Sequence, residues 1–175
     1  LYAGEWYWAA DRLHYLEARL ASLGVGRNSV TPDPLAPPLL EGQSGSDSGG
    51  AVLEIYPSLR SPYTYLAMER AFALADRWRA RVEIRFVLPM VMRGLPVPGR
   101  KRLYIMLDTK REAERAGIPF GTVVDSVGAR AARALAVLTK AIPLGKGEAF
   151  EESGCRAVCS YAIDIASARR LMPAA

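Results

Sequence analysis

The sequence predicts an α/β protein, because a helical pattern lies between two strand patterns. Apolar residues crowd 52–56, recur at helical spacing through 62–79, and alternate with polar residues from 81 before an apolar run that ends at Pro89. A strand, a helix and a second strand in so short a span form a β-α-β unit. Its strands should be parallel and its crossover right-handed.

The composition is that of a globular protein. The 175 residues are 50% hydrophobic and 23% charged, which is enough to bury a substantial core. The net charge is +5, but acidic residues are interspersed with the basic ones, and this favours a solvated surface over a polyanion partner. No basic motif with interleaved aromatic residues indicates nucleic acid.

The sequence indicates neither a membrane span nor a signal peptide. No apolar run approaches the length of a span, and the N-terminus lacks the charged, apolar and small-residue sections of a signal peptide. We therefore expect a cytoplasmic protein. The start at Leu1 suggests that the natural N-terminus lies further upstream.

The first fifty residues predict a short helical segment and a linker. Residues 1–7 are aromatic-rich, as in the last strand of a hairpin, and a helix with regularly spaced leucines begins at Ala10. Gly24 is a plausible stop for this helix. Residues 25–50 then form a linker that is first rich in proline and stiff, then rich in glycine and serine and flexible.

The turn after the first predicted strand is the main candidate site. Pro57 and Ser58 end the strand, and Pro62 favours the first turn of a helix, so Ser61 falls at the N-cap. The Ser61 hydroxyl then lies beside unpaired backbone N–H groups and the positive end of a helix dipole, where an anion such as a thiolate is stabilised. By spacing alone, a plain capping role is the more common one.

The next part of the chain predicts a loop and a second helix. Residues 90–98 form the loop, since two prolines and a glycine interrupt any helix. In the helix that begins at 100, Tyr104, Asp108 and Arg111 lie along one face. An Asp–Arg pair at this spacing is more often a surface ion pair than a ligand site.

The C-terminal part predicts packing helices without chemistry. Residues 127–140 form an amphipathic helix, 143–147 a loop and 148–162 another helix. Cys155 and Cys159 are separated by three residues, which is neither the redox spacing nor a convincing metal pair, and one histidine cannot complete a zinc site. They share a helix face, so we expect buried small hydrophobic side chains rather than disulfide chemistry.

Ser61-Pro62-Tyr63-Thr64-Tyr65, which follows a strand, resembles the active-site turn of the 2-hydroxychromene-2-carboxylate isomerase and kappa-class glutathione transferase family. Its members are DsbA-like proteins of the thioredoxin superfamily, in which serine replaces the first cysteine of the redox motif. Segment 100–120 resembles the family's helix of lysine, tyrosine, aspartate and arginine with a closing Gly-Ile-Pro. Segment 161–165 resembles a short acidic turn, and 4–13 resembles the family's closing strand and Asp-Arg helix start.

The resemblance implies a thioredoxin-like (DsbA-like) fold with an α-helical insertion. Because the family's ending precedes the linker and its beginning follows it, we expect a tandem protein. Residues 1–24 would be the C-terminal strand and helix of a preceding domain, 25–50 the linker, and 51–175 a C-terminally incomplete domain that lacks the family's Val-Pro turn and terminal strand pair. A circularly permuted single domain is the alternative.

The resemblance also implies a glutathione-dependent isomerase or transferase that acts on a small hydrophobic aromatic or conjugated substrate. Ser61 would be the catalytic residue, donating a hydrogen bond that stabilises the glutathione thiolate. The implied glutathione-binding residues are Ser61, Pro62, Tyr63 and Asp11, and the implied substrate-binding residues are Lys101, Tyr104, Met90 and Met92.

Two other functions follow from different features. A catalytically silent thioredoxin-like binding or scaffold domain is favoured by the missing Val-Pro segment and by cysteines out of register. A thiol-disulfide oxidoreductase is disfavoured, because Ser61 and Thr64 occupy both positions where the resemblance would place redox cysteines. A hydrophobic face left by the missing segments could drive homodimer formation.

Overall fold

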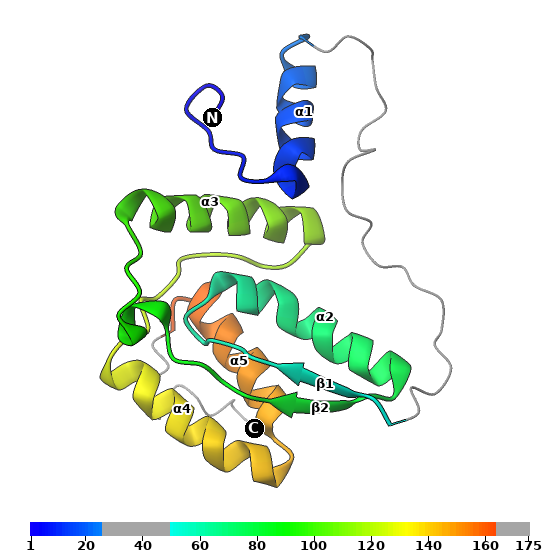
Figure 1. The fold of residues 1–175 in the computed structure, drawn as a ribbon, viewed down its shortest axis with the longest axis vertical. Coiled ribbons are helices and arrows are strands. Elements are labelled where there is room, and N and C mark those ends of the chain that lie inside the picture. Colours follow the sequence, from blue (N-terminus) through cyan, green and yellow to red (C-terminus); the bar gives the residue numbers. More distant parts are fainter. Residues whose placement is uncertain (26–49, 164–175) are drawn as a thin grey trace. The chain divides into compact units, whose positions relative to one another are not determined.

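The computed structural model describes residues 1–25 and 50–163, in two compact units, Leu1–Gln43 and Ser44–Ala175 (Figure 1). Most of the predicted linker and the last two residues of the predicted acidic turn lie outside the described residues.

The described residues of the first unit form a short helix and a β-bridge. Tyr2 and Glu5 form an antiparallel bridge with two backbone hydrogen bonds of 2.9 Å, where the sequence predicted a hairpin strand. A 3₁₀ turn, η1 (Ala10–Arg12), leads into α1 (Leu13–Ser22), and Gly24 follows with a φ of +69°. The glycine therefore stops the helix as predicted, because positive φ suits a residue without a side chain.

The second unit begins with the predicted parallel β-α-β unit. Strand β1 (Val52–Ile55) pairs in parallel with β2 (Arg81–Ile84), and Val52 lies opposite Arg81. Helix α2 (Pro62–Trp78) connects the two strands (Figure 1). The α/β class is thus confirmed, although the second strand ends at Ile84, earlier than the sequence pattern indicated.

The two faces of this sheet differ sharply in polarity. The register places Leu53, Ile55, Val82 and Ile84 on one face, and α2 covers that face with Met68 and Phe72. On the opposite face the side chains are mostly charged, and Arg85 forms ion pairs with Glu54 at 2.8 Å and Glu83 at 2.7 Å. Only one face of the sheet therefore contributes to the core.

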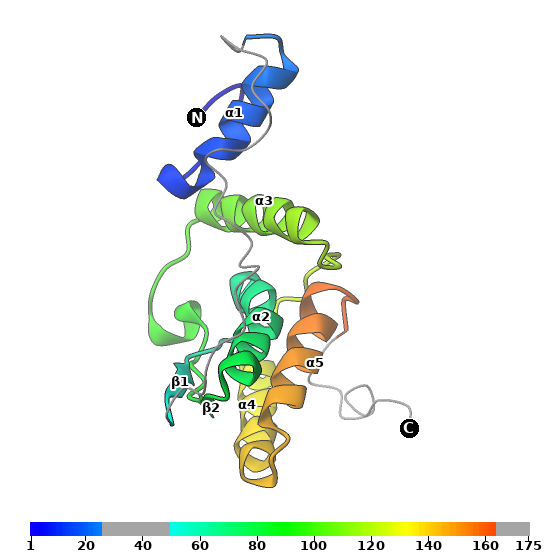
Figure 2. The same ribbon diagram turned by 90° about the vertical axis from the view of Figure 1, so that its right-hand side faces the viewer.

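After β2 the chain forms a short helical turn and then a long helix. The predicted loop contains a 3₁₀ turn, η2 (Met90–Arg93), which Gly94 ends with a φ of +72°. Helix α3 (Gly99–Ala116) follows and lies across the N-terminal end of α2 (Figure 2). Because α3 and α2 are in contact, side chains from both can meet at the start of α2.

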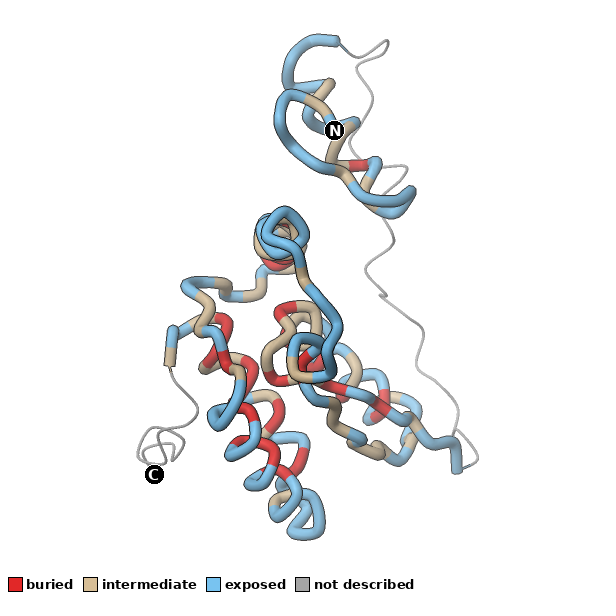
Figure 3. Tube along the Cα trace, turned by 60° about the vertical axis from the view of Figure 1, so that its left-hand side comes forward, coloured by how far each residue is buried: buried red, intermediate tan, exposed pale blue. Residues whose placement is uncertain are grey.

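Two further helices complete the main core. Helix α4 (Ala129–Ala141), the 3₁₀ turn η3 (Ile142–Leu144) and α5 (Gly147–Cys159) pack together, and α5 also packs on α2. Each helix buries one side and exposes the other (Figure 3). The last helix begins and ends earlier than the predicted 148–162, at Gly147 and Cys159.

The buried residues of this core include both cysteines, Cys155 and Cys159. This confirms the prediction that they pack as small hydrophobic side chains. The same buried cluster contains Leu59, Tyr65, Ala134, Leu135, Leu138 and Val158. Among the described residues, no helix combines the length and the apolar character needed to cross a membrane.

Candidate functional site

The turn that leads into α2 is held by reciprocal hydrogen bonds. Ser61 is the N-cap, and its Oγ accepts a hydrogen bond from the Thr64 backbone N–H at 3.3 Å. The Thr64 hydroxyl in turn accepts the Ser58 N–H at 3.2 Å, and the Ser61 N–H donates to the Ser58 carbonyl at 2.7 Å. The predicted N-cap is confirmed, with Pro62 as the first helical residue.

The Ser61 hydroxyl keeps a proton that it can donate. In its bond to Thr64 the oxygen is the acceptor, and within the described part of the chain Oγ makes no other hydrogen bond. Ser61 is only half-buried, so a ligand can approach it. The first turn of α2 carries no acidic residue, so no side-chain charge within that turn offsets the positive end of the helix dipole.

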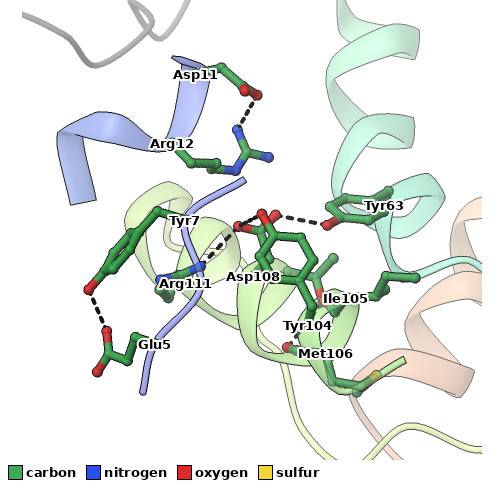
Figure 4. Close-up of polar contacts among 11 residues, drawn as sticks. Glu5, Tyr7, Asp11, Arg12, Tyr63, Tyr104, Ile105, Met106, Asp108 and Arg111 are labelled. Carbon is green, nitrogen blue, oxygen red and sulfur yellow. Dashed lines mark hydrogen bonds and ion pairs between the residues drawn. The ribbon is translucent and has the colours of Figure 1, made fainter. Parts of the chain in front are cut away.

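A second group of side chains meets beside this turn, around the carboxylate of Asp108. Tyr63 of α2 donates its hydroxyl to Oδ2 at 2.8 Å, while Tyr104 donates to Oδ1 at 3.2 Å (Figure 4). Arg111 forms an ion pair with Oδ1 through Nη2, also at 3.2 Å. The side chain of Asp108 is only 1% exposed. Tyrosine and arginine donors from two helices therefore converge on one buried carboxylate.

The predicted helix face is confirmed, but the expectation of a surface ion pair is wrong. Tyr104, Asp108 and Arg111 do share a face of α3, and that face is turned toward α2. Asp108 is buried and accepts a hydrogen bond from Tyr63 of α2, which lies 45 positions earlier in the chain. Local spacing carries no information about such a distant partner.

The other residues of the predicted substrate site are more scattered. Lys101 is exposed on α3, one turn before Tyr104, and forms no ion pair with a described residue. Met90 and Met92 lie in η2, the first exposed and the second half-buried, and neither belongs to the two buried clusters of the described core. Their role in a substrate pocket stays a prediction.

Asp11 belongs to the first unit. It lies in η1 and its carboxylate pairs with the Arg12 guanidinium at 2.7 Å (Figure 4). An acidic residue in the first turn of a helical segment is favoured by the dipole without any ligand. Its predicted contact with glutathione also stays a prediction.

Sequence reasoning missed Arg60, the residue before Ser61. Its Nε forms an ion pair with Asp125 at 2.6 Å, 65 positions later, and so ties the turn to the segment before α4. A cation beside an N-cap serine was visible in the sequence. Its partner was not, since only the tertiary fold brings the two segments together.

A groove opens further along α2. It has a volume of about 420 Å³ and is lined by α2, the end of α3 and α5; the lining side chains are Glu69, Arg70, Ala73, Ala116, Gly117, Ile118, Pro119 and Arg156. Arg156 is already paired, with Glu152 at 2.9 Å and more distantly with Glu69 at 3.9 Å. The lining of the groove therefore mixes charges of both signs with apolar side chains.

The two cysteines are unsuited to redox chemistry. Burial raises the pKa of the Cys159 thiol to about 12 and that of Cys155 well above its ordinary value. Both are therefore protonated near neutrality, whereas the thiolate is the reactive form. Among residues 1–25 and 50–163, no cluster of three or more His, Cys, Asp or Glu side chains is arranged to hold a metal ion.

The fold and the site define an α/β protein in which a Ser-Pro turn opens the helix of a parallel β-α-β unit. No family model matches the chain, and no curated protein or solved structure matches it significantly.

Proposed function

We propose that this protein is a glutathione-dependent enzyme of the isomerase and kappa-transferase type, built on a DsbA-like thioredoxin domain with a helical insertion. The observation that carries the proposal is the Ser61 N-cap, whose oxygen accepts the Thr64 N–H while its hydroxyl proton stays available. A parallel β-α-β unit before an inserted helix is compatible with that domain type.

The residues of the turn suit a thiol cofactor. Bound glutathione would supply a thiolate that adds reversibly to a conjugated substrate and is released unchanged at the end of an isomerisation. Ser61 would donate its proton as a hydrogen bond to the sulfur, and the α2 N-terminus would add positive potential. Both interactions favour the charged form and so lower the thiol pKa.

The substrate would approach from the side of η2 and α3. The exposed Lys101 ammonium suits a carboxylate or phenolate group, and Met90 and Met92 offer polarisable apolar surface for an aromatic ring. These three residues and Tyr104 are the proposed substrate contacts. A small aromatic or conjugated compound with a negative charge is the class that they fit.

The test is glutathione binding with variants that separate capping from proton donation. Ser61→Asp keeps an acceptor for the Thr64 N–H but has no proton to donate and adds a negative charge, so it should stay folded and lose glutathione binding. Ser58→Ala is the matched control, because only the backbone of Ser58 takes part in the turn. Titration calorimetry measures binding, and ultraviolet absorbance of the thiolate measures the thiol pKa.

Saturable binding by the wild type and by Ser58→Ala, with loss in Ser61→Asp, supports the proposal. Equal binding by all three proteins contradicts the role of Ser61. If the folded wild type binds no glutathione, the proposed enzyme is wrong.

A catalytically silent binding domain is the second candidate. Leu103 and Leu107 lie one turn apart on α3 and are 62% and 53% exposed, and this candidate would use them as contacts with a partner protein. This candidate predicts no glutathione binding by the folded chain. It also predicts that Leu103→Lys leaves the fold intact and abolishes association with a partner.

A further inference from the structure

The first turn of α2 is held from outside by two tyrosine hydroxyls. Tyr63 donates to the Asp108 carboxylate at 2.8 Å, and Tyr65 donates to the Pro119 backbone carbonyl at 2.6 Å. Asp108 lies on α3, and Pro119 follows three residues after that helix ends at Ala116. The inserted helix and the segment after it therefore hold the start of α2 at two points.

The hydrogen bonds to the Asp108 carboxylate are difficult to replace. Both of its oxygens are used, Oδ2 by Tyr63 and Oδ1 by Tyr104 and Arg111. Each partner is a donor, so all three are satisfied only by a side chain that accepts hydrogen bonds at both oxygen positions (Figure 4). Because the side chain is 1% exposed, water cannot readily replace a lost partner.

The held turn contains Ser61. Tyr63 is the second residue of α2 and Ser61 is its N-cap, joined to the same turn through Thr64 N–H to Oγ and Tyr65 N–H to the Ser61 carbonyl. A displacement of Tyr63 would therefore move Ser61 with it. Positions of groups that stabilise a developing or bound charge matter at the scale of 1 Å.

We propose that Asp108 is a positioning residue for Ser61. It holds the first turn of α2 through Tyr63, so that the Ser61 hydroxyl and the positive end of the α2 dipole keep a fixed direction toward a bound sulfur. This inference rests on the proposed function, and it makes α3 part of the site even where α3 does not touch the cofactor.

The test compares loss of the Tyr63–Asp108 hydrogen bond with loss of a tyrosine–carboxylate hydrogen bond elsewhere in the second unit. Tyr63→Phe breaks the bond to Asp108, and Asp108→Asn replaces one acceptor with a donor that faces another donor. Tyr56→Phe is the matched control, because the exposed Tyr56 donates to the Glu54 carboxylate at 3.0 Å on the sheet face away from α2. All three variants differ from the wild type by a few atoms.

Two measurements are made on each protein. The first is glutathione binding, for which the dissociation constant and the pKa of the bound thiol are determined. The second is amide hydrogen exchange of Thr64 and Tyr65, whose N–H groups bond to Ser61. We expect Tyr63→Phe and Asp108→Asn to weaken glutathione binding about tenfold, to raise the thiol pKa and to speed exchange about tenfold. Tyr56→Phe should match the wild type in every measurement.

The outcomes separate this inference from the proposed function. If the wild type binds glutathione and Tyr63→Phe binds it equally with an unchanged thiol pKa, the positioning role is wrong and the proposed function stands. If the wild type binds no glutathione, the proposed function fails, and exchange rates alone decide whether Asp108 holds the turn. Unchanged exchange in Tyr63→Phe, which keeps the ring and should fold, overturns the inference in either case.

Discussion

Two buried carboxyl groups of the second unit, Asp108 on α3 and Glu151 on α5, have opposite surroundings. Asp108 is surrounded by donors from two helices, with a guanidinium among them. Glu151 is 0% exposed and accepts one weak bond, from the Cys155 thiol at 3.7 Å on its own helix. Within the described residues its second oxygen has no partner.

The comparison shows that hydrogen-bond and ion-pair partners, and not burial alone, decide whether a buried carboxylate stabilises or destabilises the fold. Loss of hydration raises the pKa of Glu151 to about 7, and the Cys155 hydrogen bond opposes this shift. Glu151 therefore costs stability whenever it is charged. Asp108 instead joins α3 to α2, because its donors come from both helices.

The largest expected effect comes from removal of the Asp108 carboxylate. Asp108→Ala leaves the buried parts of Arg111, Tyr63 and Tyr104 without this acceptor, so the free energy of unfolding should fall by about 4 kcal/mol. Urea denaturation measures the change. Glu114→Ala on the exposed side of α3 is the control and should change stability by less than about 0.5 kcal/mol, because its pair with Lys110 is exposed. Equal losses of stability in the two variants would contradict the expected difference between the buried Asp108 and the exposed Glu114 carboxylates.

Glu151 should make stability fall as pH rises. Its pKa is about 7 in the folded protein and 4.5 when unperturbed, so the folded state binds more protons between these values. The stabilisation is complete below pH 4.5 and is lost as pH rises through about 7, a total of about 3 kcal/mol at 1.36 kcal/mol per pKa unit.

Glu151→Gln removes this titration, so its stability should be flat across the same pH range and exceed that of the wild type above pH 7. Urea denaturation at several pH values measures both proteins. At pH 8, Asp108→Ala should lower the free energy of unfolding and Glu151→Gln should raise it. These opposite signs are the clearest test of the comparison. Parallel pH profiles for Glu151→Gln and the wild type would show that Glu151 is paired after all.

The smallest expected effect is on the cap. Ser61→Ala loses the acceptor for the Thr64 N–H, and the free energy of unfolding should fall by about 1 kcal/mol. Ser61→Asp keeps the acceptor and should retain wild-type stability, with thermal unfolding as the measurement. If loss of the cap lowers the free energy of unfolding only a little while glutathione binding is lost, the structural and chemical roles of Ser61 are separate.

Local sequence signals predicted the elements well. Ser61, Pro62 and the apolar spacing that follows defined the start of α2, and a strand on each side of it predicted the parallel pair. The strand after 81 was predicted longer than β2, which ends at Ile84, although the Arg85 and Val87 N–H groups still donate to the Ile55 and Pro57 carbonyls at 2.8 Å. A propensity pattern reports which residues suit a strand, and it cannot report where the neighbouring strand ends.

The candidate site was only half visible in the sequence. The predicted face of α3 is present, yet Asp108 was expected at the surface and is buried. The same limit hid the pair of Arg60 with Asp125. Both depend on segments that lie far apart along the chain, and a single sequence without its fold does not reveal which of them meet.

By itself, the sequence determined the α/β class, the N-cap serine, the helix stop at Gly24 and the burial of two unreactive cysteines, because these depend on spacing and side-chain type within a few residues. Only the tertiary structure decided that α3 crosses the start of α2 and that Tyr63 reaches Asp108. Packing of distant segments sets these contacts, since the cost of burying a charge depends on every donor that the fold brings to it.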